Sequence, residues 1–554
     1  MAYKYNIYLL FLQNARYEFF ISTGSVPPGC SGAIKSEYVL NGFSPYKISV
    51  KALSLRFRGT NEIPYLCDKS GTMKNRRMEK KTILKYLLAV LACTGFAAAA
   101  RAALQDAVPG EDRQTTIRVY PRESAGKIKP VNGGNLAPPL EDEEMPGCNL
   151  REAFAGMHIP ITRLHDAPLE NPGMRLVDLP LIFANPEADA EDPDNYYFAQ
   201  TDDYIANCIA CGTEVYYRLG TSIEHSVNKY FVHPPEDVRK WVDVASNVIR
   251  HYTEGKWNGF RYDIRYWEIW NEPDLGPKMW TGTLQQFNDF YAQAATELKK
   301  RFPHLKFGGP GHCAFGEQAV RDFAGNCARH KAPLDFYSFH YYSPTDTELL
   351  QMAVDARRYL DECGYPETEI HLNEWHYNPY GGALWNMGPA EQNEAIRFMR
   401  GLESAAFLNT VMIGWQDTPL DKGFYYTVTT TRWGVFENRT PVKTYYGMKA
   451  FGELTAYPER VRTETDGMPA GSRVLAGTDS LGNLAILAAC WKSGPREFTL
   501  DIDGIGKFAR TEVFLLDETH NLSRVFETGR TAGPLKIGTV SDSGVILIRL
   551  SKND

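Results

Sequence analysis

The sequence predicts a (β/α)8 barrel followed by a smaller β-sandwich. From Asn132 onward, short apolar runs alternate with amphipathic stretches, which is the pattern of parallel strands connected by helices. Eight such runs are present, the number that closes a barrel. After about Tyr446 the pattern changes to short alternating runs separated by Gly and Asp, which is typical of an antiparallel sandwich. A chain of 554 residues is long enough for at least two such domains.

The eight predicted barrel strands are, in chain order, Val131–Leu136, Ile159–His165, Glu214–Leu219, a strand ending at Glu272, Leu305–Gly308, Leu334–Tyr342, a strand ending at Glu374, and Thr410–Trp415. Apolar residues at helical spacing predict helices between several of them, for instance Leu284–Arg301 and Thr347–Glu362. The loop after the second strand, Ala167–Gln200, is long and rich in Pro, Asp and Asn, so we expect it to wall one side of a cleft. In such a barrel the functional residues lie at the carboxyl ends of the strands.

Two regions flank the barrel, which we assign to residues 131–446. Residues 103–130 contain a linker and one strand-like run, Thr115–Tyr120. Residues 447–554 contain the sandwich, with strands predicted at Arg473–Ala476, Leu484–Ala489, Glu497–Ile502, Thr511–Leu516 and Gly544–Leu550. We expect this domain to cap the barrel; a glycan-binding module is the alternative.

The amino-terminal region has the features of an export signal. Residues 78–102 contain basic residues, a short apolar run and small residues at the end, as in a secretory signal peptide. Because such a signal stands at the start of a chain, we interpret residues 1–77 as an extension upstream of a true start at Met73 or Met78; a folded amino-terminal domain is the alternative. We expect a secreted or periplasmic bacterial protein, with ordinary cleavage favoured over a lipid anchor at Cys93 that would hold it at the cell surface.

The stretch Tyr266–Gly276 is the centre of the predicted site. Its sequence, Tyr-Trp-Glu-Ile-Trp-Asn-Glu-Pro-Asp-Leu-Gly, reads as a buried aromatic strand that stops at Pro273. The strand therefore places Glu272 at its carboxyl end. A carboxyl group buried among tryptophans holds its proton more readily, as a general acid must.

A second stretch has the same design. Glu369–Tyr377 reads Glu-Ile-His-Leu-Asn-Glu-Trp-His-Tyr, an apolar strand that carries Glu374 beside aromatic residues. One strand–helix unit takes roughly 30 residues, so Glu272 and Glu374 lie about three units apart, on strands four and seven. Hydrolysis of a glycosidic bond uses two carboxyl groups, and this barrel would hold two at one end. A lone glutamate at a strand end would more simply bond neighbouring backbone, and the pair is what favours catalysis.

The amino-acid composition and the charge limit the classes of partner that this protein can bind. The chain is 43% hydrophobic and 12% aromatic, which suits a sugar-binding cleft and equally a large core. Residues 1–102 carry 15 Lys and Arg against 5 Asp and Glu, so the rest of the chain is strongly acidic. An acidic domain argues against nucleic acid as a partner and no membrane span is expected, so a carbohydrate substrate is favoured. Cys208 and Cys211 form a CxxC on a predicted helix without a second ligand pair, so we expect two packed thiols, no metal and no cofactor.

The two glutamate motifs resemble those of a known group of enzymes. Trp-Asn-Glu-Pro on strand four with Glu-Trp on strand seven resembles the retaining glycoside hydrolases of clan A. The longer stretch Tyr-Trp-Glu-Ile-Trp-Asn-Glu-Pro-Asp-Leu is most similar to family 39, the β-xylosidase and α-L-iduronidase family. The resemblance runs from about Asn132 to the carboxyl terminus. It implies that Glu374 is the nucleophile and Glu272 the general acid/base, and that the strand Thr115–Tyr120 pairs with the carboxyl-terminal β domain.

The resemblance also implies roles for polar and aromatic residues at other strand ends. Asn271 is expected to bond the sugar 2-OH, His165 and His340 to contact hydroxyl groups, Tyr342 to lie near the nucleophile, Trp415 to floor the first subsite, and Arg163 to pair with a carboxylate below the site. Asp166, Gln416 and Asp417 close strands two and eight and complete the predicted rim. The family often has Trp before the strand-six His, whereas this chain has Phe339 there and Tyr341 after it.

Two further acidic residues have other expected roles. Glu268 shares a face with Glu272 but lies roughly 13 Å down the strand at 3.3 Å per residue, so we expect it inside the barrel with a structural role. We expect Asp274 to orient the loop.

The sugar, the linkage, exo or endo action and the oligomeric state stay open. A β-xylosidase is favoured, and α-L-iduronidase, β-galactosidase and arabinosidase remain alternatives. A uronidase would need a cation near the sugar carboxylate, for which Lys422 and Arg432 are candidates. Other classes are an inverting enzyme, a lyase, and an inactive glycan-binding protein on the same fold.

Overall fold

The structure is a computed structural model. It describes residues 114–136, 150–165 and 177–552, together with four short strands nearer the amino terminus. These are β1 (Glu37–Val39), β2 (Ser49–Lys51), β3 (Leu66–Cys67) and β4 (Met73–Lys74), paired antiparallel as β1–β2 and β3–β4. The chain forms two units, Met1–Glu111 and Asp112–Asp554, and the second unit contains the barrel and the carboxyl-terminal sheet. The predictions on the signal peptide 78–102, on Cys93 and on Asp166 fall outside the described residues.

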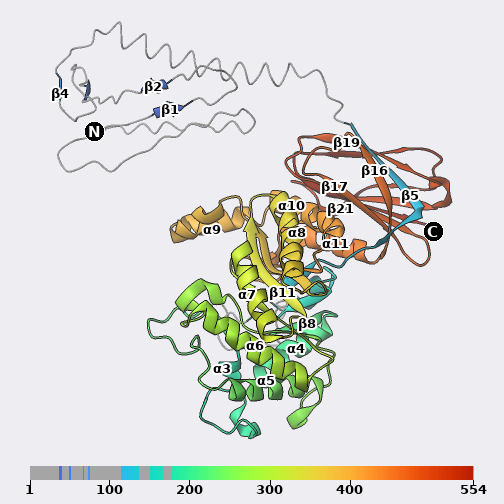
Figure 1. The fold of residues 1–554 in the computed structure, drawn as a ribbon. Coiled ribbons are helices and arrows are strands. Elements are labelled where there is room, and N and C mark those ends of the chain that lie inside the picture. Colours follow the sequence, from blue (N-terminus) through green and yellow to red (C-terminus); the bar gives the residue numbers. More distant parts are fainter. Residues whose placement is uncertain are drawn as a thin grey trace. The chain divides into compact units, whose positions relative to one another are not determined.

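Eight parallel strands close into a barrel, which confirms the predicted architecture (Figure 1). Their order around the barrel is β6, β7, β8, β9, β10, β11, β12, β13 and back to β6, so neighbours in sequence are neighbours in space. The strands are β6 (Gly133–Asn135), β7 (Ile161–Arg163), β8 (Glu214–Arg218), β9 (Tyr266–Glu268), β10 (Lys306–His312), β11 (Phe336–Ser343), β12 (Glu369–Tyr377) and β13 (Lys422–Tyr425).

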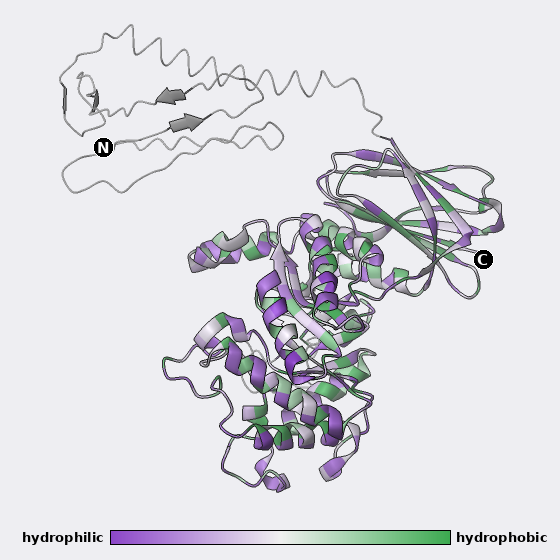
Figure 2. Ribbon diagram, viewed as in Figure 1, coloured by the Kyte–Doolittle hydropathy of each residue, from purple (hydrophilic) through white to green (hydrophobic). Residues whose placement is uncertain are grey.

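Helices follow most strands and show a mixture of polar and apolar residues along their length (Figure 2). The longest, α6, begins with a capping box in which Thr283 and Gln286 bond each other's backbone. The helices are α2 (Arg151–Ala155), α3 (Leu179–Ile182), α4 (Ala199–Ala210), α5 (Val238–Thr253), α6 (Leu284–Arg301), α7 (Glu317–His330), α8 (Asp346–Glu362), α9 (Pro389–Phe398), α10 (Leu402–Gly414) and α11 (Lys443–Thr455). Short 3-10 turns are η1 (Pro193–Asn195), η2 (Lys256–Asn258), η3 (Pro273–Lys278), η4 (Gly381–Asn386), η5 (Trp415–Asp417) and η6 (Ile505–Lys507). In the part of the chain that the structure describes, no helix is long and apolar enough to cross a membrane.

The predicted eighth strand is wrong. Residues 410–415 lie in α10 and at its end, and the eighth strand is β13, seven residues further on. Every residue of α10 from Leu402 to Gly414 except Glu403 is buried, because the helix lies between the barrel and the carboxyl-terminal sheet. A helix buried all round has no polar face, so a short window of it cannot be told from a buried strand.

The carboxyl ends of strands four and seven also differ from the prediction. β9 ends at Glu268 and not at Glu272, while β12 continues past Glu374 to Tyr377. Glu272 has φ 46° and ψ 48°, in the left-handed region. Pro273 disfavours the right-handed helical region for the residue before it, and the chain satisfies this restriction by the left-handed conformation rather than by an extended strand. Glu272 therefore stands on a tight backbone turn above the strand.

A nine-stranded, mostly antiparallel sheet follows the barrel. Its order is β21, β20, β23, β18, β17, β16, β5, β19, β22. The strands are β5 (Gln114–Lys127), β16 (Glu459–Asp466), β17 (Arg473–Thr478), β18 (Leu484–Cys490), β19 (Arg496–Ile502), β20 (Arg510–Leu516), β21 (Asn521–Thr528), β22 (Leu535–Val540) and β23 (Gly544–Ser551), and a two-stranded hairpin, β14 (Phe436–Glu437) and β15 (Thr440–Pro441), precedes α11. β5 pairs antiparallel with β16 and parallel with β19, so the expected pairing of this early strand with the later domain is confirmed.

This sheet contributes buried side chains to two separate cores. One face packs on the barrel helices through residues such as Leu475, Leu487 and Leu547. The opposite face forms its own core, in which Ile117 of β5 and Phe498 of β19 join Ile486, Ile548 and other residues of the remaining strands. Because strands from both ends of the sheet share that core, the sheet folds over itself into two layers.

Candidate active site

The barrel interior is filled in layers. The lowest layer is a cluster of buried apolar and aromatic side chains, Ile161, Tyr216, Tyr266, Phe336 and Phe424. Above it, towards the carboxyl ends of the strands, the side chains become polar and charged. A charged layer inside a closed barrel requires complete pairing, since an uncompensated buried charge is costly.

Arg163 at the end of β7 is the centre of that charged layer. It is completely buried, and its Nε donates to Glu268 Oε2 at 2.7 Å. Its Nη1 donates to Asn135 Oδ1 at 3.0 Å and to Glu374 Oε1 at 2.9 Å, and its Nη2 donates to Asn271 Oδ1 at 2.6 Å. The guanidinium therefore fixes four side chains, which come from β6, from β9 and the loop after it, and from β12. The expected pairing of Arg163 with a carboxylate below the site is present, and it involves two carboxylates.

Glu268 lies beneath the site, as expected. Its side chain is fully buried, and besides Arg163 it accepts hydrogen bonds from Ser338 Oγ at 2.7 Å and from the Asn373 side-chain amide. All of its neighbours are fixed protein groups, so its role is to hold Arg163.

Glu374 is surrounded by groups that favour its ionised form. Its Oε1 lies 2.9 Å from Arg163 Nη1 and 3.4 Å from His165 Nε2. Its Oε2 accepts a hydrogen bond from Tyr342 Oη at 3.1 Å and lies 3.5 Å from His340 Nδ1. Burial alone would raise the pKa of this carboxyl group, but the charge on His340, the hydrogen bond from His165 and the charge on Arg163 outweigh burial and hold the pKa well below its usual range. Glu374 is thus a buried carboxyl group whose ionised form is favoured.

Glu272 stands opposite and is more open to solvent. Its side chain is 18% exposed against 6% for Glu374. Its backbone N–H donates to Gly311 O at 2.9 Å, and Asp274 accepts the backbone N–H of Cys313 at 2.9 Å, so β10 steadies this turn on both sides. The expectation that Asp274 orients the loop is confirmed. One carboxylate oxygen of Glu272, one of Glu374 and a ring nitrogen of His340 all lie within 4.8 Å of one another.

His340 connects the two glutamates. It is completely buried, and its Nδ1 is 2.7 Å from Glu272 Oε1 and 3.5 Å from Glu374 Oε2. Its Nε2 has no hydrogen-bond partner among the described residues. Burial alone would lower the pKa of the ring, but the negative charges of Glu374 and Glu272 outweigh it and raise the pKa of His340. Because Nδ1 faces two carboxylates, it carries a proton.

Gly311 allows this arrangement to be compact. It has φ 62°, and a Cβ there would lie 3.1 Å from Glu268 Oε1, 3.3 Å from His340 Nε2 and 3.5 Å from Asn271 Oδ1. Any side chain at this position would press on the groups that carry the site.

An aromatic wall, which the sequence did not predict, borders the glutamates. The ring of Tyr426 lies 5.9 Å from that of His165 and 6.2 Å from that of Tyr342, measured between centroids. Trp433 lies 5.7 Å from Tyr342 and 6.3 Å from Tyr426, and Trp385 lies 5.9 Å from Trp433. Tyr426 directly follows β13, so a correct assignment of the eighth strand would have placed it at the site.

The structure brings most of the predicted site residues together around Glu272 and Glu374 and places three of them elsewhere. Arg163, His165, Asn271, Glu272, His340, Tyr342 and Glu374 form one connected group, as the contacts above show. Trp415 does not join it: its ring is fully buried, packs on Trp375 at 4.8 Å, and donates from Nε1 to Leu349 O at 3.3 Å. Gln416 and Asp417 also follow α10, where Gln416 bonds Lys129 and Asp417 bonds Arg460.

The structure also locates the two candidate cations and the two cysteines of the CxxC motif. Lys422 begins β13, and its Nζ lies 4.8 Å from the centroid of the Tyr266 ring in the lowest layer, so it is at the opposite end of the barrel from Glu374. Arg432 follows β13 and donates to Gln392 Oε1 at 3.1 Å. Cys208 and Cys211 lie on and just after α4, and no disulfide joins the described cysteines.

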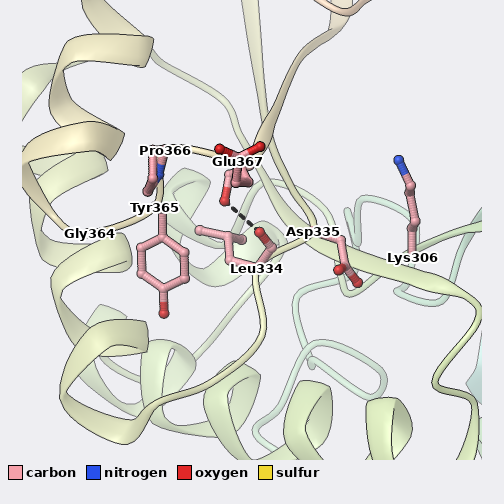
Figure 3. A pocket seen from close by; sticks show the side chains of 8 residues that line it. Lys306, Leu334, Asp335, Gly364, Tyr365, Pro366 and Glu367 are labelled. Atoms are coloured by element: carbon pink, nitrogen blue, oxygen red, sulfur yellow. Dashed lines mark hydrogen bonds between the residues drawn. The ribbon is translucent and has the colours of Figure 1, made fainter.

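The barrel also has a pocket at its amino-terminal end (Figure 3). It measures about 300 Å³ and is lined by Lys306, Leu334, Asp335 and residues 364–368, which precede or begin β10, β11 and β12. Two of its charged groups are already paired, Lys306 with Glu369 and Asp335 with Lys299. This position below the strands is the end of such barrels that serves stability rather than chemistry.

A metal ion is one conceivable occupant of the site, since Glu272, His340 and Glu374 are the one group of potential ligands with suitable spacing among the described residues. The charges around them do not fit one. Arg163 lies 2.9 Å from Glu374, and the proton on His340 Nδ1 occupies the nitrogen that would have to bind the ion. The donors therefore suit a neutral sugar with hydroxyl groups better than a cation.

A parallel barrel that holds two close glutamates, an arginine beneath them and an aromatic wall beside them defines the glycoside hydrolase class of clan A. Within that class, the chain is similar to glycosyl hydrolase family 39. The model of "Glycosyl hydrolases family 39" matches residues 186–363, a range that includes Glu272 and His340.

Several known proteins are similar to this chain in sequence or in fold. A "Beta-xylosidase" from Geobacillus stearothermophilus is 27% identical over 231 residues, which are 36% of this chain and 45% of the relative. A glucosidase from Croceicoccus marinus superposes with a TM-score of 0.64 at 22% identity, covering 79% of this chain and 99% of that one. A GH39 β-xylosidase from Caulobacter crescentus has a TM-score of 0.59 at 15% identity, covering 79% and 99%. The alignment thus spans about half the length of the curated relative, and the two structures share the fold.

Proposed function

We propose that this protein hydrolyses glycosidic bonds with retention of configuration at the anomeric carbon. The observation that carries the proposal is the approach of Glu272 and Glu374, whose carboxylate oxygens lie within 4.8 Å of each other. Retaining enzymes hold their carboxyl groups about 5–5.5 Å apart, and inverting enzymes leave about 6.5–9.5 Å so that a water molecule can enter. The spacing favours the first mechanism.

The two glutamates have environments suited to different roles. Glu374, ionised and held by Arg163, His165 and Tyr342, attacks the anomeric carbon while the bond to the leaving oxygen breaks. Glu272, the more exposed carboxyl group, gives its proton to that oxygen. In the second half, Glu272 takes a proton from water, the water oxygen bonds the anomeric carbon, and Glu374 leaves as a carboxylate.

The remaining groups orient the sugar. The Oδ1 of Asn271 is occupied by Arg163, so its amide NH2 is the end that is left to donate to a sugar hydroxyl group. The imidazole of His165 stands beside Glu374 and Tyr426. Rings such as Tyr426 and Trp433 offer flat apolar faces to the C–H face of a sugar.

For the sugar we propose a β-xyloside, supported by the resemblance to proteins named β-xylosidase. Galactoside and arabinoside specificity remain alternatives. Iduronide specificity is disfavoured because Lys422 lies at the other end of the barrel. Arg432 is then the one of the two candidate cations that could meet a sugar carboxylate. The fold is shared with a protein named α-L-arabinofuranosidase from Thermotoga maritima, so fold alone does not choose among them.

The test is hydrolysis of a panel of aryl glycosides (β-xyloside, α-L-arabinosides, β-galactoside and α-L-iduronide). Glu374→Ala is expected to lower kcat by about 10⁴-fold or more. Added azide should then yield a glycosyl azide of inverted configuration from Glu374→Ala and one of retained configuration from Glu272→Ala. Glu369→Gln, a change on the same strand β12 but at the other end of the barrel, is the control and should keep activity.

Two results would contradict the proposal. Inverted product from the unaltered protein would replace retention by inversion. Tight sugar binding without turnover of any glycoside, unchanged in Glu374→Ala, would favour the inactive glycan-binding protein.

We also propose that the mature protein is exported, on the strength of residues 78–102 alone. Sequencing the amino terminus of protein secreted by a bacterial host tests this, and a start near residue 103 is expected. An intact leader in the cytosol would refute it.

A further inference from the structure

Trp385 is the exposed end of the aromatic wall. Its side chain is 56% exposed, while its ring lies 5.9 Å from Trp433 and 6.1 Å from Tyr342, between centroids. Tyr342 in turn bonds Glu374 at 3.1 Å. The wall therefore runs without a break from the nucleophile to a large apolar surface in contact with solvent.

The turn that carries Trp385 is fixed rather than loose. It belongs to η4, whose neighbouring residue Leu384 is completely buried in a cluster with Trp433 and α9. The side chain of Asn378 binds the turn twice, donating to Gly381 O at 3.1 Å and accepting from Tyr380 N at 3.1 Å. Gln392 of α9 donates to Leu384 O at 3.1 Å. The indole is thus held in place before any ligand arrives, which lowers the entropy lost on binding.

Exposure of a tryptophan on a fixed turn needs a reason, because burying its ring would be favourable. The indole packs against Trp433 and Tyr342 and still leaves 56% of the side chain exposed. A flat apolar surface beside polar amide and hydroxyl groups suits a sugar ring, which has an apolar C–H face and a polar edge. Trp385 contacts Tyr342, and Tyr342 bonds Glu374, so the indole lies one side chain further out than the ring that touches the nucleophile.

We propose that Trp385 is the stacking platform for a second, uncharged sugar unit, the neighbour of the unit whose bond is cleaved. This inference rests on the proposed glycosidase activity and makes it more specific. The substrate is then an oligosaccharide or a polysaccharide end, and not only a monosaccharide glycoside.

The test compares two substrates of the same glycone. For Trp385→Ala, kcat/KM on β-1,4-xylotriose should fall about tenfold. A tenfold change corresponds to about 1.4 kcal/mol, which is within the range of a stacking contact of an aromatic ring. The value on p-nitrophenyl β-xyloside should stay within about twofold. Trp385→Phe keeps a flat ring and should restore most of the loss. Leu481→Ala removes another exposed apolar side chain, 71% exposed, from a turn of the carboxyl-terminal sheet and is the control.

Other results overturn the proposal. An equal fall on both substrates would place Trp385 at the reacting sugar, and no fall on either would leave it without a ligand. If no xyloside is turned over, the glycosidase proposal fails separately. Calorimetric binding of β-1,4-xylotetraose to Glu374→Gln, with and without Trp385→Ala, then decides about the platform: weakening by about tenfold supports it, and equal affinity or no binding refutes it.

Discussion

The Nδ1 of His340 lies 2.7 Å from Oε1 of Glu272, so in the acid role that we propose for Glu272 this bond determines which oxygen carries the proton. Because His340 Nδ1 donates to Oε1, the proton that Glu272 transfers must sit on its other oxygen, Oε2. That oxygen belongs to a side chain that is partly open to the cleft. His340 therefore positions the acid without itself meeting the leaving group.

Removing His340 should harm the reaction selectively. In His340→Ala, kcat on an alkyl or sugar leaving group should fall by about 10²-fold, within the range of general acid catalysis, whereas a dinitrophenyl leaving group needs no proton and should lose less than about threefold. The asparagine of His340→Asn presents an N–H near the place of Nδ1 and should recover part of the activity. Steady-state kinetics on a series of leaving groups measures this. Equal losses throughout the series would show that His340 acts on Glu374 or on folding.

The same variant should change the pH profile. Glu374 must be ionised to attack, and the charge on His340 is the first of the groups that lower its pKa against the effect of burial. Without His340 the pKa of Glu374 rises towards its usual value, so activity should be lost at a higher pH on the acidic side. Profiles of kcat/KM in His340→Ala and the unaltered protein, with the dinitrophenyl substrate, test this sign; a superimposable acidic limb would contradict it.

Loss of Arg163 should destabilise the whole barrel. In Arg163→Met, Glu268 and Glu374 lose their shared buried cation, and breaking a buried pair costs about 3–5 kcal/mol in the free energy of unfolding. Urea unfolding at neutral pH measures this cost. Arg122→Met breaks the exposed pair with Asp503 and serves as the control that should leave the midpoint unchanged. Equal midpoints for the two variants would show that the buried network adds nothing.

Gly311→Ala should impair catalysis more than folding. The new Cβ would come within 3.3 Å of His340 Nε2 and 3.1 Å of Glu268 Oε1, so we expect a fall in kcat of at least about tenfold, of the size that a displaced catalytic group produces. Gly212→Ala is the matched control, because Gly212 also has a positive φ, 76°, but nothing lies within 4 Å of its would-be Cβ. Both variants should lose similar stability, about 1 kcal/mol. Similar kcat values in the two would refute steric pressure on the site.

His376 should make the fold sensitive to acid. Burial lowers its pKa to about 4, and its Nε2 bonds Tyr425 Oη at 2.7 Å. Between pH 6.5 and 4 the unfolded chain binds a proton that the folded His376 refuses, so stability falls as pH falls through this window, by up to about 3 kcal/mol. Urea unfolding at pH 7, 5 and 4 should show a smaller decline in His376→Gln. An unchanged decline would mean that other groups cause it.

The barrel could be predicted because its elements obey local rules. Alternation of apolar runs and amphipathic helices is visible in the sequence, and α6 and α8 lie where the helical spacing placed them. The eighth strand was missed for a physical reason: α10 is buried on every side, whereas β13 is a short Lys-Gly-Phe-Tyr segment with little apolar signal. Local pattern could not rank the two without knowing that the sheet covers α10.

The sequence predicted those residues of the site that stand in motifs at the ends of strands. Glu272 and Glu374 follow from their motifs, but the bridging position of His340 and the fourfold bonding of Arg163 arise from the barrel's closure and appear in no single segment. The wall of Tyr426, Trp433 and Trp385 depended on the misassigned eighth strand and on a loop of irregular backbone.

β5 lies inside the nine-stranded sheet, between β16 and β19, although the whole barrel separates it in sequence from both. The ribosome therefore finishes the barrel before β16 and β19 have been made. Until these two strands are synthesised, β5 lacks its partners in the sheet. The barrel is topologically an insertion into the β domain. A gene fragment cut at the border between the two would yield a sheet with a gap in its middle, because β5 would be missing between β16 and β19.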